Sequence, residues 1–214
     1  MDNRHDILQL LRQVADGSTA PEEALSQLKR APFEDLGYAK VDLHRGVRQG
    51  AAEVIYGAGK TPEQIAGIAA AMGARGCQNI LITRLNQEAA DAVAKAVPLD
   101  YHPIPRLAVA FPGVRKELGR IVVATGGTSD MAVAEEAALT EVLGNRVVRL
   151  YDVGVAGLHR LLSNLESLTS ARCVVAVAGM EGALASVIGG LVDCPVIAVP
   201  TSVGYGASFG GLSA

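Results

Sequence analysis

The sequence predicts an α/β protein in which a parallel sheet with helices on both faces, three layers in all, follows a smaller α/β domain. Apolar runs begin near residues 121, 147, 173 and 196, at spacings of 26, 26 and 23 residues, and each interval has room for one helix. This rhythm is typical of repeated βαβ crossovers, which make their strands parallel. Half of the 214 residues are hydrophobic, which suits a sheet buried on both faces.

The first half of the chain predicts a helical arm and a small α/β domain. Helical spacing of apolar residues and a capping-box pattern at Thr19 predict helices over 5–16 and 19–30. The elements expected next are strands over 38–42 and 53–56, a helix from Thr61 to 72, a strand over 79–83, a helix over 87–96 and a strand over 107–111. Residues 57–61 are not a P-loop, because Val54 stands where that motif needs glycine.

The second half predicts the parallel sheet. Helices are expected over 131–143, 155–165 and 181–191, with the last strand over 195–199. We expect the two domains to span residues 1–116 and 117–214. No residue from 195 to 214 is charged, so we expect the C-terminal end of the domain to be missing from this sequence.

The loop after the first strand of the second half is the main candidate site. Gly126 and Gly127 are followed by Thr128, Ser129 and Asp130, at the carboxyl end of a strand, where ligands bind in open α/β sheets. Backbone N–H groups and hydroxyls there could hold a phosphate, and Asp130 could move a proton. The alternative is that Ser129 or Asp130 only caps the next helix.

Other polar residues have two interpretations each. Glu181 follows a strand and suits either a ligand contact or the charge preferred at a helix start. His159 falls inside a predicted helix, so packing is as good an explanation as acid–base work. Arg45 and Arg48 could clamp a phosphate or carboxylate, or pair with Asp42 in a solvated loop.

Composition excludes several classes of function. A formal charge of −3 provides no basic stripe for nucleic acid, and no uncharged apolar stretch reaches the roughly 18 residues of a membrane span. The polar start lacks the apolar core of a signal peptide, so we expect a cytoplasmic protein. Cys77, Cys173 and Cys194 follow no metal or disulfide spacing and are expected to be reduced.

Several motifs in order carry a resemblance to a known family. They are residues 124–130, 154–160, 179–183 and 199–206, and in the first half Asp42, Arg45, Arg48, Gly50, 53–55 and 59–61. The second half resembles the PurE-like aminoimidazole ribonucleotide carboxylase fold, of the flavodoxin type. Both halves together resemble the LarB family, the carboxylase/hydrolase of nickel-pincer nucleotide cofactor biosynthesis.

The resemblance implies an activity and a substrate. The family carboxylates C5 of the pyridinium ring of nicotinic acid adenine dinucleotide, with CO2 or bicarbonate as co-substrate, and then hydrolyses the phosphoanhydride to release AMP. It implies no tightly bound cofactor, allows Mg²⁺ to assist the hydrolysis, and suggests a homo-oligomer such as an octamer. By the same resemblance, the catalytic candidates are Asp130, Glu181 and Ser129, and the substrate-binding candidates are Gly126, Gly127, Thr128, His159, Met180, Asp42, Arg45 and Arg48.

One departure from the family stands out. Members continue past the equivalent of Ala214 into a segment that carries the cysteine which adds to the pyridinium ring, and no cysteine of this sequence matches it. Two other functions stay open: an aminoimidazole ribonucleotide carboxylase or mutase of purine biosynthesis, and a nucleotide-binding module without catalysis.

Overall fold

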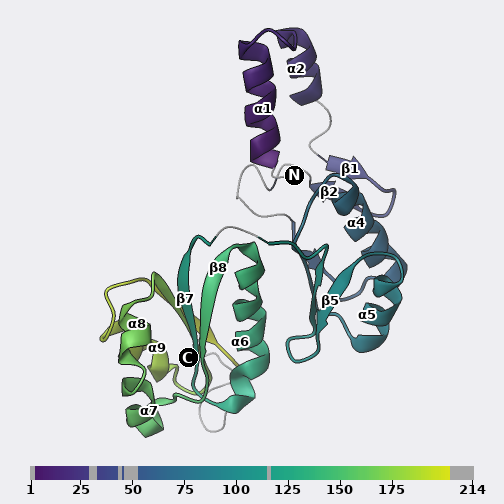
Figure 1. Ribbon diagram of the computed structural model, residues 1–214. Helices are drawn as coiled ribbons and strands as arrows, with labels where there is room; N and C mark the ends of the chain where they lie inside the picture. Colours follow the sequence, from purple (N-terminus) through teal and green to yellow (C-terminus); the bar gives the residue numbers. More distant parts are fainter. Residues whose placement is uncertain (1–2, 29–32, 43–44, 46–52, 115–116, 203–214) are drawn as a thin grey trace. The chain divides into compact units, whose positions relative to one another are not determined.

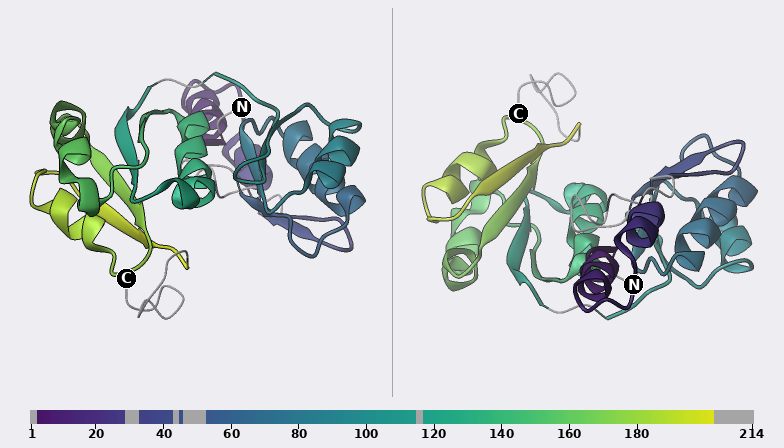
Figure 2. Two further views of the ribbon diagram at one scale, coloured as in Figure 1. Left: turned by 90° about the horizontal axis from the view of Figure 1, so that it is seen from below. Right: turned by 90° about the horizontal axis from the view of Figure 1, so that it is seen from above.

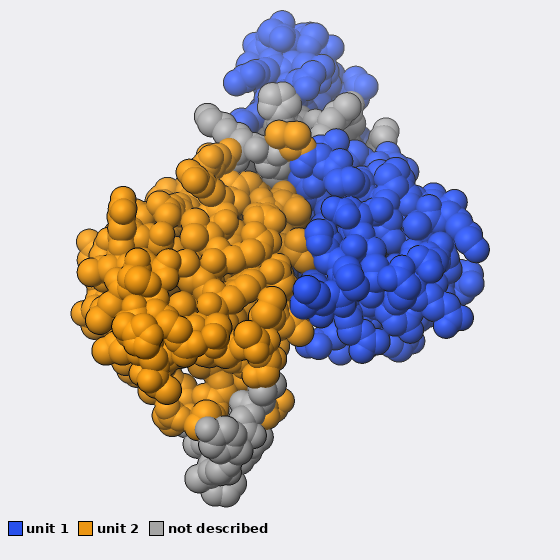
Figure 3. Space-filling view, turned by 60° about the horizontal axis from the view of Figure 1, so that its bottom comes forward, with its two compact units in different colours: residues 1–113 blue, residues 114–214 orange. Residues whose placement is uncertain are grey.

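The computed structural model describes residues 3–28, 33–42, 45, 53–114 and 117–202 (Figure 1). The chain divides into two compact units, residues 1–113 and 114–214, which are coloured separately in Figure 3. Each unit has its own hydrophobic core. They are described in turn.

Unit 1 begins with the predicted helical arm. Helices α1 (Asn3–Ala15) and α2 (Pro21–Leu28) are joined by a short turn and pack side by side (Figure 1). Leu10 and Ala24 are buried, whereas Leu8, Leu11 and Leu25 are about half exposed. The arm therefore has a small apolar contact of its own.

The rest of unit 1 is a two-stranded hairpin and a four-stranded mixed sheet. The hairpin pairs β1 (Phe33–Asp35) with β2 (Lys40–Asp42). The sheet and its helices are β3 (Ile55–Tyr56), α4 (Pro62–Ala74), β4 (Ile80–Thr83), α5 (Gln87–Ala94), β5 (Leu99–His102) and β6 (Leu107–Ala110). The strand order is β3-β4-β6-β5; β3 and β4 are parallel, and β6 runs antiparallel to both β4 and β5.

Local sequence explains where the two helices of this sheet begin. The Thr61 hydroxyl accepts a hydrogen bond from the Gln64 amide, and the Thr61 N–H donates to the Gln64 side-chain oxygen, which makes a capping box. Asn86 caps α5 through the Ala89 amide. The predictions for these helices are confirmed within two residues at each end.

Two strands of unit 1 were not predicted. Both β1 and β5 carry charged or polar residues at most positions, so they lack the apolar run by which strands are recognised. Strand β5 is held instead by its pairing with β6 and by Tyr101, whose hydroxyl donates to the Leu85 carbonyl O at 3.0 Å. Tertiary contacts decide its conformation.

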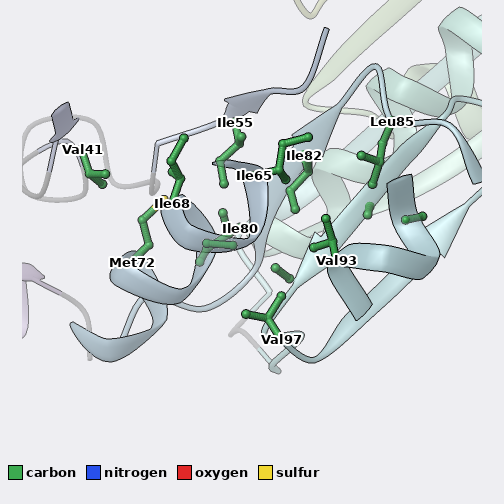
Figure 4. Packing of buried hydrophobic residues seen from close by; sticks show 14 residues of the cluster. Val41, Ile55, Ile65, Ile68, Met72, Ile80, Ile82, Leu85, Val93 and Val97 are labelled. Atoms are coloured by element: carbon green, nitrogen blue, oxygen red, sulfur yellow. The ribbon is translucent and has the colours of Figure 1, made fainter. Parts of the chain in front are cut away.

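The core of unit 1 lies between its sheet and helices α4 and α5 (Figure 4). Ile65 and Met72 from α4 and Val93 from α5 pack against Ile80 and Ile82 of β4, and all are at most 1% exposed. These side chains belong to one continuous apolar cluster.

Replacing Met72 by alanine should destabilise unit 1 by about 2–5 kcal/mol, because a fully buried side chain is lost and a cavity remains. Hydrogen exchange of the backbone amides of β4 and β6 measures the free energy of opening of unit 1, separately from that of unit 2. Ala70 is exposed on the same helix, so Ala70→Ser is the matched control and should change it by less than about 0.7 kcal/mol. Equal effects of the two substitutions would contradict the assigned core.

Unit 2 is the predicted parallel sheet. Its strands are β7 (Gly119–Thr125), β8 (Asn145–Leu150), β9 (Cys173–Ala178) and β10 (Val196–Pro200), all parallel, in the order β10-β9-β7-β8. Its helices are α6 (Met131–Ala138), α7 (Leu158–Leu162), α8 (Leu165–Thr169) and α9 (Ala183–Gly189), with 3-10 turns η1 (Thr128–Asp130), η2 (Leu139–Leu143) and η3 (Val155–Gly157). In sequence order the strands are arranged 2-1-3-4, which is the flavodoxin type.

Alternate residues of β7 enter two different cores. Val123 packs with Ala134 and Ala138 of α6, whereas Val122 and Ala124 pack on the opposite face, where α7, α8 and α9 lie. Figures 1 and 2 show these helix layers on either side of the sheet. The three-layer α/β prediction is therefore confirmed.

The predicted helices of unit 2 are too long. The segment 131–143 changes from α-helix to 3-10 helix after Ala138, and the segment 155–165 is broken at Gly157 and again at Asn164, whose backbone angles are not helical. Helix α9 begins only at Ala183, because Gly182 adopts a left-handed conformation with φ of 66°. Apolar spacing alone does not register such interruptions.

A network of hydrogen bonds joins β8 and the loop after it to α6 and η2. Arg149 donates to both carboxylate oxygens of Glu141, at 3.0 Å each, and to Glu135 at 3.2 Å. The Tyr151 hydroxyl donates to the other oxygen of Glu135 at 2.8 Å. Burial, and then the bond to the Glu135 carboxylate, raise the pKa of Tyr151 above its ordinary value.

This shift predicts a pH dependence of stability. The unfolded chain releases the Tyr151 proton near pH 10, before the folded chain does, so the stabilisation present below about pH 10 is lost as the pH rises above it. Tyrosine ordinarily titrates between about pH 9.5 and 11. Over this range the free energy of unfolding should therefore fall more steeply with pH in the wild type than in Tyr151→Phe. Urea unfolding at each pH measures it, and identical slopes would contradict the prediction.

Candidate active site

The polar loops of unit 2 meet at the carboxyl edge of its sheet. The connection after β7 leads to β8 on one side of β7, and the connection after β8 leads to β9 on its other side. The strand order therefore reverses between β7 and β9. In sheets of this order the ligand crevice opens at that switch point. The loop that ends at Asp130 follows β7, and the loop of Met180 and Glu181 follows β9.

Asp130 is buried and held by hydrogen bonds from two loops. Only 4% of it is exposed; its Oδ1 accepts a bond from the Thr201 hydroxyl at 2.7 Å, and its Oδ2 accepts one from the Gly127 amide at 3.1 Å. Its carboxylate makes no capping bond to α6, although the residue stands at the N-cap position. Its bond from the Gly127 amide caps the 3-10 turn η1 as the N3 residue of a capping box, so capping accounts for this bond but not for the bond from Thr201.

Gly126, before Asp130, and Gly154, after β8, have steric reasons. A β-carbon on Gly126 would lie 3.3 Å from the Ala178 β-carbon of β9 and 3.6 Å from the Asp130 carboxylate. A β-carbon on Gly154, in the loop after β8, would overlap the Gly126 carbonyl oxygen. The loop after β7 thus packs closely against the backbone of the loop after β8 and against the end of β9.

Thr125 connects the β7 and β8 loops. It is fully buried, its hydroxyl accepts from the Asp152 amide at 3.0 Å, and its carbonyl accepts from the Val153 amide at 2.9 Å. Asp152 itself has φ of 57° and pairs with Arg160 at 2.6 Å. This left-handed turn fixes an ion pair of exposed side chains next to the Gly126 loop.

The remaining candidates of unit 2 are accessible to a ligand. Thr128, Ser129 and Glu181 are exposed, and Met180 is 37% exposed with φ of 58°. His159 is also exposed and lies in the first turn of the short α7, not in the middle of a long helix as predicted. The packing explanation of His159 is therefore wrong, and its imidazole faces solvent.

The candidates of unit 1 lie on and after β2. The Asp42 amide donates to the Glu53 carboxylate at 2.9 Å, and Arg45 is partly buried. Arg48 lies outside the described residues. The predicted arginine clamp stays a prediction.

The cysteines occupy other places. Cys77 packs against the core of unit 1, and Cys173 and Cys194 lie at the amino ends of β9 and β10, at the opposite edge of the sheet from Asp130. Burial, with a smaller contribution from Cys194, raises the pKa of the Cys173 thiol, which makes its thiolate scarcer. Neither Cys173 nor Cys194 can reach the candidate site.

Within the described ranges, no three His, Cys, Asp or Glu side chains gather in a way that would hold a metal ion. In the same ranges, every helix is too short or too polar to cross a membrane.

Sequence reasoning missed three residues of this site. Thr201 is 71 positions from Asp130 and reaches it only because β10 pairs with β9. A hydroxyl directly after an apolar strand was the available signal. Arg160 lies in the motif 154–160, but its pairing with Asp152 could not be predicted, because the pair depends on the broken helix after β8.

The parallel sheet and its polar switch point define a PurE-like domain, and comparison with known proteins agrees. Residues 33–111 match the LarB/PurE-like N-terminal domain family, and residues 120–212 match the AIR carboxylase family. An uncharacterized protein of Methanocaldococcus jannaschii is 36% identical over 210 residues, covering 92% of this chain and 81% of its own length. The LarB/PurE-like N-terminal domain is followed by the AIR carboxylase domain in this chain, and the chain belongs to the LarB family.

Proposed function

We propose that this protein carboxylates C5 of the pyridinium ring of nicotinic acid adenine dinucleotide and hydrolyses its phosphoanhydride. The products are AMP and pyridinium-3,5-biscarboxylic acid mononucleotide, for synthesis of the nickel-pincer cofactor. Membership of a carboxylase-type family supports the reaction class. The observation that carries the proposal is a buried, doubly hydrogen-bonded Asp130 at the switch point of the AIR carboxylase domain.

The chemistry requires a proton acceptor at the ring. A pyridinium carbon is electron-poor, so a nucleophile must first add to the ring and turn C5 into an enamine-like carbon that attacks CO2. The C5 proton must then leave before the nucleophile departs and the ring regains its aromaticity. We assign the acceptance of that proton to Asp130, whose two hydrogen bonds fix the position of its carboxylate. The nucleophile is not assigned to Cys77, Cys173 or Cys194.

The neighbouring loops suit the nucleotide. The exposed hydroxyls of Thr128 and Ser129 can bind phosphate and ribose oxygens. The Gly126 and Gly127 amides donate instead to the Val177 carbonyl and the Asp130 carboxylate, where they hold the loop in place. Glu181 is exposed after β9 and can orient the water that adds to the phosphoanhydride. Within unit 2, His159 and Met180 would complete the substrate contacts. A substrate contact by Asp42, Arg45 or Arg48 of unit 1 stays a prediction.

The test is direct. Full-length protein is incubated with nicotinic acid adenine dinucleotide and bicarbonate, with and without Mg²⁺, and products are separated by liquid chromatography with mass detection. We expect AMP and a doubly carboxylated mononucleotide in equal amounts. Turnover of aminoimidazole ribonucleotide instead would replace the proposal by purine-type carboxylation, and binding without any product would favour a nucleotide-binding module.

A further inference from the structure

Three cationic side chains of unit 1 are attached to one edge of its sheet. Lys60 lies in the turn after β3, Arg84 directly follows β4, and Arg106 directly precedes β6. Because β3 and β4 are parallel and β6 is antiparallel to β4, all three positions fall at the same edge. The proposed function uses none of them.

The two arginines stand opposite each other. Ile82 pairs with Ala108, and extending this register by two residues places Arg84 opposite Arg106. The Leu85 amide donates to the Arg106 carbonyl at 2.8 Å. Both residues are exposed. Like charges directly opposite each other on neighbouring strands repel, so this arrangement favours an anion between them.

The backbone at this edge is strained. Arg84 and Arg106 have φ of 56° and 53°, which are unfavourable for residues with a β-carbon. A β-carbon on Gly57, the neighbour of Arg84 across β3 and β4, would lie only 2.7 Å from the Thr83 carbonyl oxygen. Strained conformations concentrate at functional sites, where surrounding structure holds them in place.

The cations at this edge lack acidic partners within the described part of the chain. Neither Arg84 nor Arg106 takes part in an ion pair there, and the Lys60 ammonium donates only to the Tyr56 carbonyl at 2.8 Å, which keeps it at the end of β3. By contrast, Arg75 of the same unit pairs with Glu34 at 3.2 Å. The edge is thus a set of positive charges held without counter-charges.

We propose that Lys60, Arg84 and Arg106 form an anion site for a phosphate-bearing ligand, either free diphosphate or the phosphates of a nucleotide. Two guanidinium groups can each donate two parallel hydrogen bonds to phosphate oxygens, and the ammonium adds a third charge. The site belongs to unit 1 alone and does not depend on the proposed function.

Calorimetric titration of full-length protein with inorganic pyrophosphate tests the site, with AMP as a second arm. We expect saturable binding that Arg84→Gln and Arg106→Gln each weaken by about tenfold, the loss of one charge-assisted contact. Arg75→Gln, the matched control, should leave the dissociation constant within about twofold. Tighter arginine-dependent binding of AMP identifies a nucleotide; equal or tighter binding of pyrophosphate identifies free diphosphate. Absence of saturable binding in both arms, or equal weakening by the control, would overturn the site.

Arg84→Gly separates binding from folding. Glycine adopts φ of 56° without a steric penalty, so this variant should keep or raise the unfolding midpoint while losing the same affinity. Wild-type affinity in a folded Arg84→Gly protein would overturn the proposal. These titrations leave the carboxylation assay untouched, so failure of one proposal is not failure of the other.

Discussion

Replacing Asp130 by asparagine is expected to lower kcat for carboxylation by about 10²–10⁴-fold, the usual contribution of a positioned general base. Asparagine is nearly isosteric and can still accept the Thr201 hydroxyl bond, but its amide nitrogen cannot accept a proton from the ring. We therefore expect KM for the dinucleotide to change much less than kcat. Initial rates of product formation, followed by mass detection, measure both.

Two controls make this result specific. Asp193 is exposed in the turn before β10, at the opposite edge of the sheet, so Asp193→Asn should leave kcat unchanged. Thr201→Val removes the hydroxyl that binds Oδ1 but keeps the carboxylate, so it should reduce kcat by a smaller factor than Asp130→Asn. If Asp130→Asn retains wild-type kcat while folded, Asp130 is not the proton acceptor.

Replacing Gly154 by alanine is expected to damage both stability and activity. Its backbone angles are open to any residue, with φ of −59°, so the difficulty is space: the new methyl group would overlap the carbonyl oxygen of Gly126. Backbone cannot rotate away as a flexible side chain can, so the loops after β7 and β8 must separate, at a cost of about 1–3 kcal/mol. Thermal unfolding and the carboxylation assay measure the two effects.

Gly189 provides the matched control for this substitution. It lies in α9, and a β-carbon there would meet nothing within 4 Å. Gly189→Ala should therefore stabilise the protein by up to about 1 kcal/mol through helix propensity. A Gly154→Ala protein as stable and active as the wild type would show that the contact between the two loops is not needed.

The sequence was informative where apolar runs are continuous. Strands expected near residues 121, 147, 173 and 196 begin at 119, 145, 173 and 196. The two central strands β7 and β9 fit this rule best, because a strand covered on both faces needs a nearly continuous apolar stretch. It was uninformative where tertiary pairing decides the conformation, as in β5, whose polar residues are held by β6.

The same division applies to the candidate site. Asp130 was identified because glycines and hydroxyls follow a strand, and this is a local pattern. Its bond to Thr201 could not be predicted, since it depends on β10 lying beside β9. The exposure of His159 was missed because the breaks at Gly157 and Asn164 leave no trace in apolar periodicity.

The edges of the unit 2 sheet bear on how copies of the chain meet. In the described residues β10 forms one border, ending on Pro200, which has no N–H to offer an incoming strand; the other border, β8, carries Arg146 and Arg149. Both devices discourage edge-to-edge sheet extension and the aggregation that follows from it. Contacts between copies of this domain through these two strands are therefore disfavoured.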